Sequence, residues 1–109
     1  MIPEILGLLR YLTHFTSNKN QLTGNIHVQL ANLTGLQFLD LSYNWLNGSI
    51  PREVFSLSIL RILDLTSNSL SRQIPQNFSR KMLRLRIGKN YLSGTIPFTI
   101  GRVPRLAFL

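Results

Sequence analysis

Cysteine is absent from this chain of 109 residues, and acidic residues are scarce. Without cysteine the chain has no disulfide and no thiolate metal ligand. Four Asp and Glu residues oppose twelve Lys and Arg residues, which gives a formal net charge of +8 at pH 7. Such an excess can indicate a nucleic-acid-binding surface. An uneven share of charge on one small domain explains it with fewer assumptions.

Long hydrophobic runs are absent as well. Glu4 and Arg10 interrupt the apolar start, so no stretch reaches the roughly 20 apolar residues of a membrane-spanning helix. Residues 1–4 also lack the basic start of a signal peptide. The length allows one domain at most, and a hydrophobic content of 44% is sufficient for a packed core.

What the chain does contain is a pattern of apolar residues around an asparagine, which occurs four times. The clearest copy reads Leu36-x-x-Leu39-x-Leu41-x-x-Asn44-x-Leu46-x-Gly48-x-Ile50-Pro51. The asparagines of the four copies are 24, 24 and 22 residues apart, at Asn20, Asn44, Asn68 and Asn90. A repeat of about 20–29 residues with this spacing is typical of a leucine-rich-repeat solenoid.

Successive copies define the coils of the predicted solenoid. We expect coils at 9–32, 33–56, 57–78 and 79–102, with partial coils at 1–8 and 103–109. Neither end carries the polar cap that a solenoid needs, so the sequence predicts a fragment of a longer array. A solenoid usually binds through an extended surface and not through a catalytic pocket.

Each coil is expected to contain one strand whose side chains alternate between two faces. Leu39 and Leu41 are predicted to point inward, and Phe38, Asp40 and Ser42 outward. Stacked strands then form a parallel sheet on the concave face, about 4.8 Å apart. On the convex face we expect loops and short helical turns, the turns at 52–55, 76–79 and 98–101.

The asparagine of each repeat has a structural explanation. The chain turns sharply after the strand, and buried turn backbone needs hydrogen-bond partners. Because an Asn amide both donates and accepts, Asn20, Asn44, Asn68 and Asn90 are predicted to form a ladder that joins neighbouring turns.

Several positions depart from the repeat. Ser17 stands at an inward apolar position, His27 at a proline position and Arg72 at a glycine position. The third copy is also two residues shorter, near residues 80–81. We expect these departures to alter local geometry and not the fold, because loops on the convex side tolerate changes of length.

The segment Leu-Asp-Leu-Ser-Tyr-Asn-Trp-Leu-Asn-Gly-Ser-Ile-Pro at 39–51 resembles the plant-specific leucine-rich repeat, and Gly-x-Ile-Pro recurs at 94–97. The resemblance implies a right-handed superhelix whose inner sheet faces the ligand, with a second strand from the Leu-x-Gly-x-Ile-Pro segment. Repeats of this type form extracellular arrays of receptor-like kinases, receptor-like proteins and inhibitors of cell-wall-degrading enzymes. The sequence contains neither kinase motifs nor the paired cysteines of the family's caps.

Binding is expected at the variable, outward positions of the strands. In the stacked rows, Phe38 and Ile62 form an apolar strip, and Arg84 and Arg86 form a basic end. We predict a protein or peptide partner across these rows, with an acidic group near the two arginines. The alternative is that these four coils lie outside the ligand footprint of a longer array. The candidate residues are Phe38, Asp40, Tyr43, Ile62, Asp64, Arg84, Arg86 and Lys89.

Other chemistry is not favoured by the residues present. Asp40 and Asp64 are expected to lie side by side, but no nucleophile or metal-ligating His accompanies them, so a solvated Asp pair is the better interpretation. His14 and His27 occupy different phases of the coil, which argues against a shared metal site. We therefore expect no catalytic residue, metal or cofactor. Tyr91 is expected to pack against the coils, which makes a stacking site for nucleic acid unlikely.

Three Asn-x-Ser/Thr sequons are compatible with a glycosylated, extracellular protein. Asn32 is the first candidate acceptor, Asn77 the second and Asn47 the third. The resulting hypothesis is a non-catalytic recognition module of a plant receptor ectodomain at the cell surface, whose partner is a peptide, a protein or another leucine-rich-repeat receptor. The alternatives are a secreted inhibitor of cell-wall-degrading enzymes and a polyanion binder. A membrane connection would come from segments outside this chain.

Overall fold

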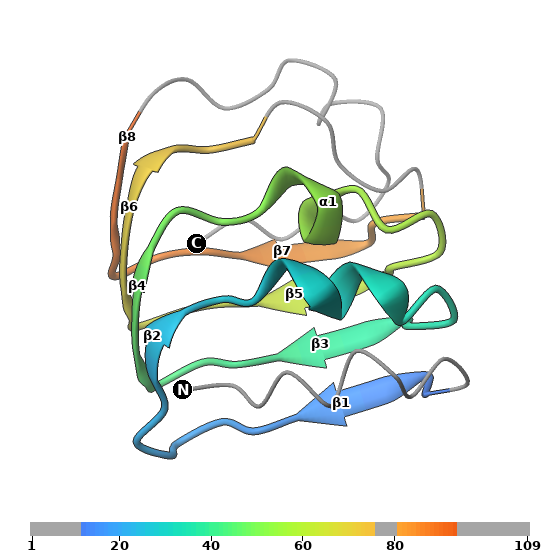
Figure 1. Ribbon diagram of the computed structural model, residues 1–109, viewed down its shortest axis with the longest axis horizontal. Helices are drawn as coiled ribbons and strands as arrows, with labels where there is room; N and C mark the ends of the chain where they lie inside the picture. Colours follow the sequence, from blue (N-terminus) through green and yellow to red (C-terminus); the bar gives the residue numbers. More distant parts are fainter. Residues whose placement is uncertain (1–11, 76–80, 94–109) are drawn as a thin grey trace.

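The computed structural model describes residues 12–75 and 81–93. The described chain contributes strands to two parallel sheets, which confirms the predicted solenoid of stacked coils (Figure 1). The first sheet has the strand order β1–β3–β5–β7 and the second the order β2–β4–β6–β8. The strands of the first sheet are β1 (His14–Thr16), β3 (Phe38–Asp40), β5 (Ile62–Asp64) and β7 (Arg84–Arg86).

The repeat length determines the register of the first sheet. Phe38 of β3 lies opposite Ile62 of β5, and Leu39 opposite Leu63, because the two positions are one repeat apart. The same register continues from Leu63 to Leu85 across β5 and β7. Equivalent residues of successive coils therefore form rows across the sheet, so an apolar position repeated in sequence becomes an apolar column.

The second sheet forms from the chain that follows each asparagine. Its strands are β2 (Thr23–Asn25), β4 (Trp45–Gly48), β6 (Ser69–Gln73) and β8 (Tyr91–Ser93). The resemblance implied a second strand in this region, and the structure confirms one. Strand β4 begins directly after Asn44 and ends at Gly48, before Ile50 and Pro51.

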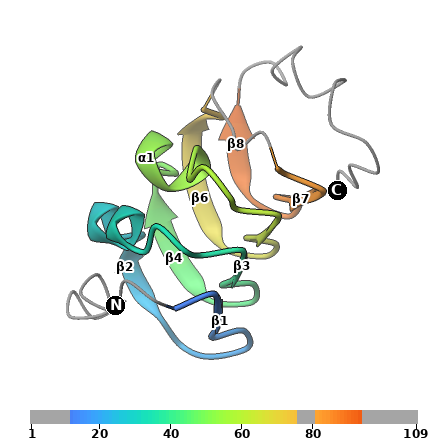
Figure 2. The ribbon, with the colours of Figure 1, turned by 90° about the vertical axis from the view of Figure 1, so that its right-hand side faces the viewer.

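Two short helical segments cover the side of the coils opposite the first sheet (Figure 2). Helix α1 (Arg52–Phe55) starts after Pro51 and matches the turn expected at 52–55. The 3-10 helix η2 (Val28–Asn32) was not anticipated, because His27 replaces the proline there. The His27 ring nitrogen Nδ1 accepts a hydrogen bond of 3.2 Å from the backbone of Gln29 and so caps η2. The turns expected at 76–79 and 98–101 lie outside the described residues.

The core consists of the inward columns closed by the helical segments. Leu39, Leu63 and Leu85 of the first sheet are fully buried, as is Phe55 of α1. Burial of one such side chain contributes roughly 1.5–3 kcal/mol to stability. The core is continuous from coil to coil, so each coil depends on its neighbours for burial of its apolar side.

The asparagines after the strands join adjacent coils. The Asn68 amide donates to the carbonyls of Leu65 in its own coil, 3.2 Å, and Leu41 in the preceding coil, 3.0 Å. Its oxygen accepts the backbone N–H of Leu46 at 3.0 Å. Asn44 and Asn90 make the equivalent bonds with their preceding coils.

Asn20 differs from the other three asparagines. Its side chain is exposed and donates to the Ser17 hydroxyl and the Asn18 carbonyl of the same coil, both at 3.1 Å. Residues 1–11, at the start of this coil and before it, are outside the described part. The polar Ser17 at an inward position thus supplies an acceptor for Asn20.

One expected orientation is wrong. Ser42 was expected to point outward, but it is only 3% exposed. Its hydroxyl and its backbone N–H donate to the Asp40 carboxylate at 2.6 and 3.0 Å. Thr66 makes the same pair of bonds with Asp64 in the next coil, at 2.7 and 3.1 Å. The strand ends at the aspartate, so the two-residue alternation does not extend to the following hydroxyl.

Three further observations concern positions singled out in the sequence. Arg72 has a φ of 70°, close to the values of 81° and 76° at the equivalent Gly24 and Gly48, so the arginine adopts the left-handed conformation of the glycine that it replaces. Asn32 and Asn47 are exposed, whereas Asn77 is outside the described residues. Among the described helices, none is long and apolar enough to cross a membrane.

Candidate functional site

The outward rows of the first sheet bring together side chains of different chemistry. His14, Phe38, Ile62 and Arg84 follow one another across the four strands. The rings of His14 and Phe38 stack, with centroids 5.8 Å apart and an angle of 25° between the ring planes. With Ile62 they form a largely apolar strip that ends at the exposed Arg84.

The next row combines acidic and basic groups. Thr16, Asp40, Asp64 and Arg86 are in register across the sheet. Arg86 Nη1 lies 4.0 Å from Asp64 Oδ2, a long contact for an ion pair. The Arg86 Nε atom is buried, and no described residue accepts its hydrogen. The Arg86 side chain is nevertheless 41% exposed, so the outer part of its guanidinium offers donors to a bound carboxylate.

The two aspartates are held by local hydrogen bonds. Each carboxylate accepts from the hydroxyl two residues later, Ser42 for Asp40 and Thr66 for Asp64. The sequence had suggested a solvated pair, whereas each carboxylate is held by hydrogen bonds within the protein. Within residues 12–75 and 81–93, no group of three or more potential metal ligands occurs.

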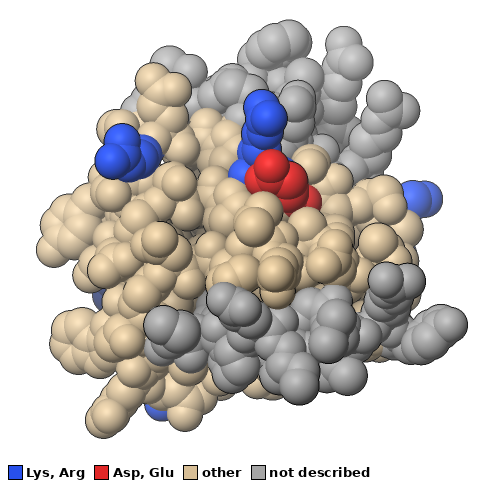
Figure 3. Space-filling model, in the orientation of Figure 1, with Lys and Arg blue, Asp and Glu red and all other residues tan. Residues whose placement is uncertain are grey.

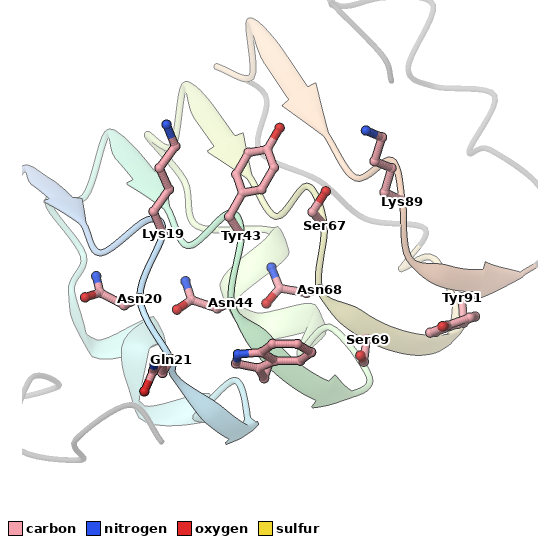
Figure 4. Close-up of a pocket in the computed structure, with 11 residues that line it drawn as sticks. Lys19, Asn20, Gln21, Tyr43, Asn44, Ser67, Asn68, Ser69, Lys89 and Tyr91 are labelled. Atoms are coloured by element: carbon pink, nitrogen blue, oxygen red, sulfur yellow. The ribbon is translucent and has the colours of Figure 1, made fainter.

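A hollow of about 610 Å³ opens beside the first sheet, where the chain passes to the second (Figure 4). Three rows of side chains line it, and each row runs across successive coils. The row before the asparagines consists of Lys19, Tyr43, Ser67 and Lys89; the middle row of Asn20, Asn44 and Asn68; and the row after them of Gln21, Trp45, Ser69 and Tyr91.

Backbone geometry positions the first of these rows. Lys19, Tyr43, Ser67 and Lys89 have φ values of 55°, 58°, 59° and 53°, in the left-handed region. A residue other than glycine rarely adopts this conformation, which costs roughly 1–2 kcal/mol. Its recurrence in four coils follows from the sharp turn before each asparagine, and it directs the four side chains to the same edge of the hollow (Figure 4).

Of the three aromatic residues of the hollow, the sequence identified Tyr43 but not Trp45 or Tyr91. Trp45 was not singled out, and Tyr91, which was expected to pack against the coils, is 74% exposed. Trp45 is 63% exposed. Both directly follow a ladder asparagine. The sequence signal that could have identified them is the variable residue directly after the asparagine of each repeat.

Charge is distributed unevenly over the described surface. Acidic side chains within it are Asp40 and Asp64 on the first sheet and Glu53 on α1, and none of them lines the hollow. Figure 3 shows the side of the molecule that carries α1, where most described side chains are uncharged. Arg52 Nε and Glu53 Oε2 of α1 lie 3.9 Å apart. The first sheet and the hollow therefore offer cations, amides, hydroxyls and aromatic rings for recognition.

Comparisons with known proteins agree with this architecture. The sequence model of the Leucine Rich Repeat family matches residues 35–57 and 60–80. A search of curated proteins finds no match. Solved structures do match. The chain spans 59% of the SOBIR1 ectodomain and 18% each of RGFR1 and HAESA.

Three of these structures illustrate the likeness. The ectodomain of the receptor kinase SOBIR1 from Arabidopsis thaliana is 38% identical, with 98% of this chain covered and a TM-score of 0.90. The plant peptide hormone receptor RGFR1, in complex with RGF2, is 46% identical, with 98% covered and a TM-score of 0.91. The Arabidopsis receptor kinase HAESA, in complex with the peptide hormone IDA and the co-receptor SERK1, is 29% identical, with 99% covered and a TM-score of 0.91.

Proposed function

We propose that this chain, which belongs to the leucine-rich-repeat proteins, is a recognition module of a plant receptor ectodomain and binds a peptide or protein through its first sheet. The similar structures support this proposal, because RGFR1 and HAESA are each seen with a peptide hormone. Since the chain spans only 18% of each, the ligand and partners of a whole receptor are part of the proposal. The extracellular location is proposed on the same basis.

The Arg86 side chain carries the proposal. The side chain is 41% exposed, and its only ion-pair contact among the described residues, with Asp64, is 4.0 Å long. Arg84 is exposed two residues earlier on the same strand. A carboxylate of a ligand can accept from both arginines, since hydrogen bonds between charged groups are roughly twice as strong as neutral ones.

The apolar strip supplies the second part of the recognition surface. Phe38 and Ile62 are half-buried and lie next to each other in register. A ligand that crosses the strands places an apolar side chain on this strip and an acidic group at Arg84 and Arg86. The ligand is thus expected to be an extended segment that combines both. Another leucine-rich-repeat receptor is proposed as a further partner, since HAESA is seen with its co-receptor.

Binding of RGF2 and of synthetic acidic peptides to the 109-residue chain tests this function. In isothermal titration calorimetry, Arg86→Gln is expected to weaken binding about tenfold, or about 1.4 kcal/mol, because it leaves the ligand carboxylate without one charged partner. Affinity for the unchanged chain is expected to fall as salt rises. The affinity is expected to be higher for peptides that carry both an acidic and an apolar side chain than for peptides that carry an acidic side chain alone.

The matched control is Arg52→Gln, which removes the same charge from helix α1 on the other side of the coils. This variant is expected to bind as the unchanged chain does. Equal losses for Arg52→Gln and Arg86→Gln would show that only net charge matters. That result would contradict a peptide site on the first sheet.

A further inference from the structure

The hollow beside the first sheet contains a gap one coil wide. The third coil of the protein contributes small side chains to the lining, whereas the second and fourth coils contribute large ones (Figure 4). Neighbouring coils are roughly 4.8 Å apart, so the walls are about 10 Å apart at the backbone, which leaves room for one flat ring between the wall side chains. We name this gap the slot. Its floor is formed by Ser67 and Ser69, and its walls by Tyr43, Trp45, Lys89 and Tyr91.

The aromatic rings of the slot are exposed to solvent. The exposed fractions are 49% for Tyr43, 63% for Trp45 and 74% for Tyr91. Rings with a polar tip are stable where one end is apolar and the other is hydrated. These three thus present flat apolar surfaces and keep the phenol hydroxyls and the indole N–H available for hydrogen bonds.

The charge of the hollow has one sign. Lys19 and Lys89 are its charged lining residues, and both are exposed at opposite ends of the same row. Among residues 12–75 and 81–93, no carboxylate lines it. Because the chain as a whole has a net charge of +8, the local potential favours an anionic ligand over a neutral or cationic one.

We propose that the slot binds an acidic oligosaccharide, a sugar chain whose rings carry carboxylates. A sugar ring has apolar C–H faces, which stack on Trp45 and Tyr91, and hydroxyl groups at its edge, which meet Ser67 and Ser69. Its carboxylate pairs with Lys89. This site is separate from the peptide site on the first sheet and does not rest on that function.

The size of the hollow favours a saccharide over a protein. A volume of about 610 Å³ lies within the range of roughly 300–1,000 Å³ that is typical of small-ligand sites. A stable protein interface covers about 800 Å² on each partner. The few side chains that form the slot are suited to one or two sugar rings.

Trp45 is the single tryptophan of the chain and makes the site observable. Titration of the 109-residue chain with trigalacturonate is expected to change Trp45 fluorescence in a saturable manner. Maltotriose, which is neutral, should bind at least about fivefold more weakly, because it cannot pair with a lysine.

Substitutions in the slot distinguish its parts. Tyr91→Ala is expected to weaken binding about tenfold through loss of a stacking surface, and Lys89→Gln about fivefold through loss of the ion pair. Ser69→Phe, which fills the floor, should abolish binding while the circular dichroism spectrum stays unchanged. Arg52→Gln, on helix α1, is the matched control and should leave trigalacturonate binding unchanged.

Several outcomes would overturn the proposal. One is a fluorescence signal that does not saturate, and another is equal binding of maltotriose. Equal weakening by Arg52→Gln and Lys89→Gln would indicate a general charge effect. Displacement of trigalacturonate by hexaglutamate at lower concentration would show that the slot prefers acidic peptides. Loss of peptide binding on Arg86→Gln bears only on the first-sheet function.

Discussion

A single asparagine in each coil holds the turns of this solenoid in register. In the described residues, Asn44, Asn68 and Asn90 each bond to carbonyls of two coils and to one backbone N–H of the preceding coil. Asn44 and Asn68 are also among the few buried polar residues. A buried polar group left without its partner costs about 1–3 kcal/mol. The asparagines therefore stabilise the stack through groups that no apolar side chain can satisfy.

Asn68→Ala is expected to lower the free energy of unfolding by about 3 kcal/mol, because it leaves the Leu46 N–H and the Leu41 and Leu65 carbonyls unsatisfied. Asn20→Ala is the matched control, since that side chain is exposed and should cost less than about 1 kcal/mol. Urea unfolding followed by circular dichroism measures both. Similar losses would mean that the bonds between coils contribute little.

Whether a side chain points inward or outward was predicted correctly where the repeat specifies it. The prediction for Ser42 was wrong, because a local hydrogen bond decides its burial. The inward leucines follow from spacing alone. Ser42 does not, because its burial depends on a bond to Asp40 that the alternation of a strand does not contain. The exposure of Trp45 depends on which neighbours the next coil provides at that edge, and the serines of the third coil leave its ring uncovered.

At the level of elements, the second sheet depends on close approach of its strands. Gly48 of β4 has a φ of 76°, and a Cβ there would lie 2.5 Å from the Asn25 side-chain oxygen. Gly24 of β2 has a φ of 81° but no atom within 4 Å of its would-be Cβ. The two glycines share the backbone requirement and differ in their surroundings, so they separate conformational strain from crowding.

Gly24→Ala is expected to destabilise the protein by about 1 kcal/mol through the left-handed backbone alone. Gly48→Ala should cost about as much, because the methyl group meets only the end of the exposed Asn25 side chain, which can rotate away. Thermal unfolding of both variants measures the two costs. A clearly larger loss for Gly48→Ala would show that Asn25 cannot move aside.

The element boundaries show the same division between pattern and context. Helix α1 occupies the turn expected at 52–55 because Pro51 favours the start of a helical turn. Segment η2 forms without that proline, since His27 caps it and Leu30 is buried against the core. Burial of apolar side chains therefore supports both helical turns, and a proline at the start of the turn is not required.

For the whole molecule, stability comes from contacts between neighbouring coils. Each strand of the first sheet pairs with the strands of adjacent coils. The buried leucine column of β3, β5 and β7 continues in β1 as the partly buried Phe15. In such a quasi-one-dimensional arrangement, stability is approximately the sum of coil and interface contributions. A change in a central coil therefore affects two interfaces at once.

Leu63→Ala, in the fully buried column of β5, is expected to cost about 2–5 kcal/mol and to reduce hydrogen-exchange protection in β3 and β7 together. Ile62→Ala is the control, because the neighbouring side chain faces the half-buried outer row and should cost less than Leu63→Ala. Loss of protection confined to β5 would contradict coupling between the coils.

The order of apolar residues and asparagines was enough to predict the stacked coils, the parallel first sheet and the rows of outward residues, because a periodic pattern can bury its apolar side in only one way. The hollow, the slot and the unpaired Nε of Arg86 required the folded chain. They arise between side chains of different coils, about 20 or more residues apart, whose sizes and contacts vary independently of the repeat. The recognition that we propose rests on those variable positions, and the repeat provides the rigid frame that brings them together.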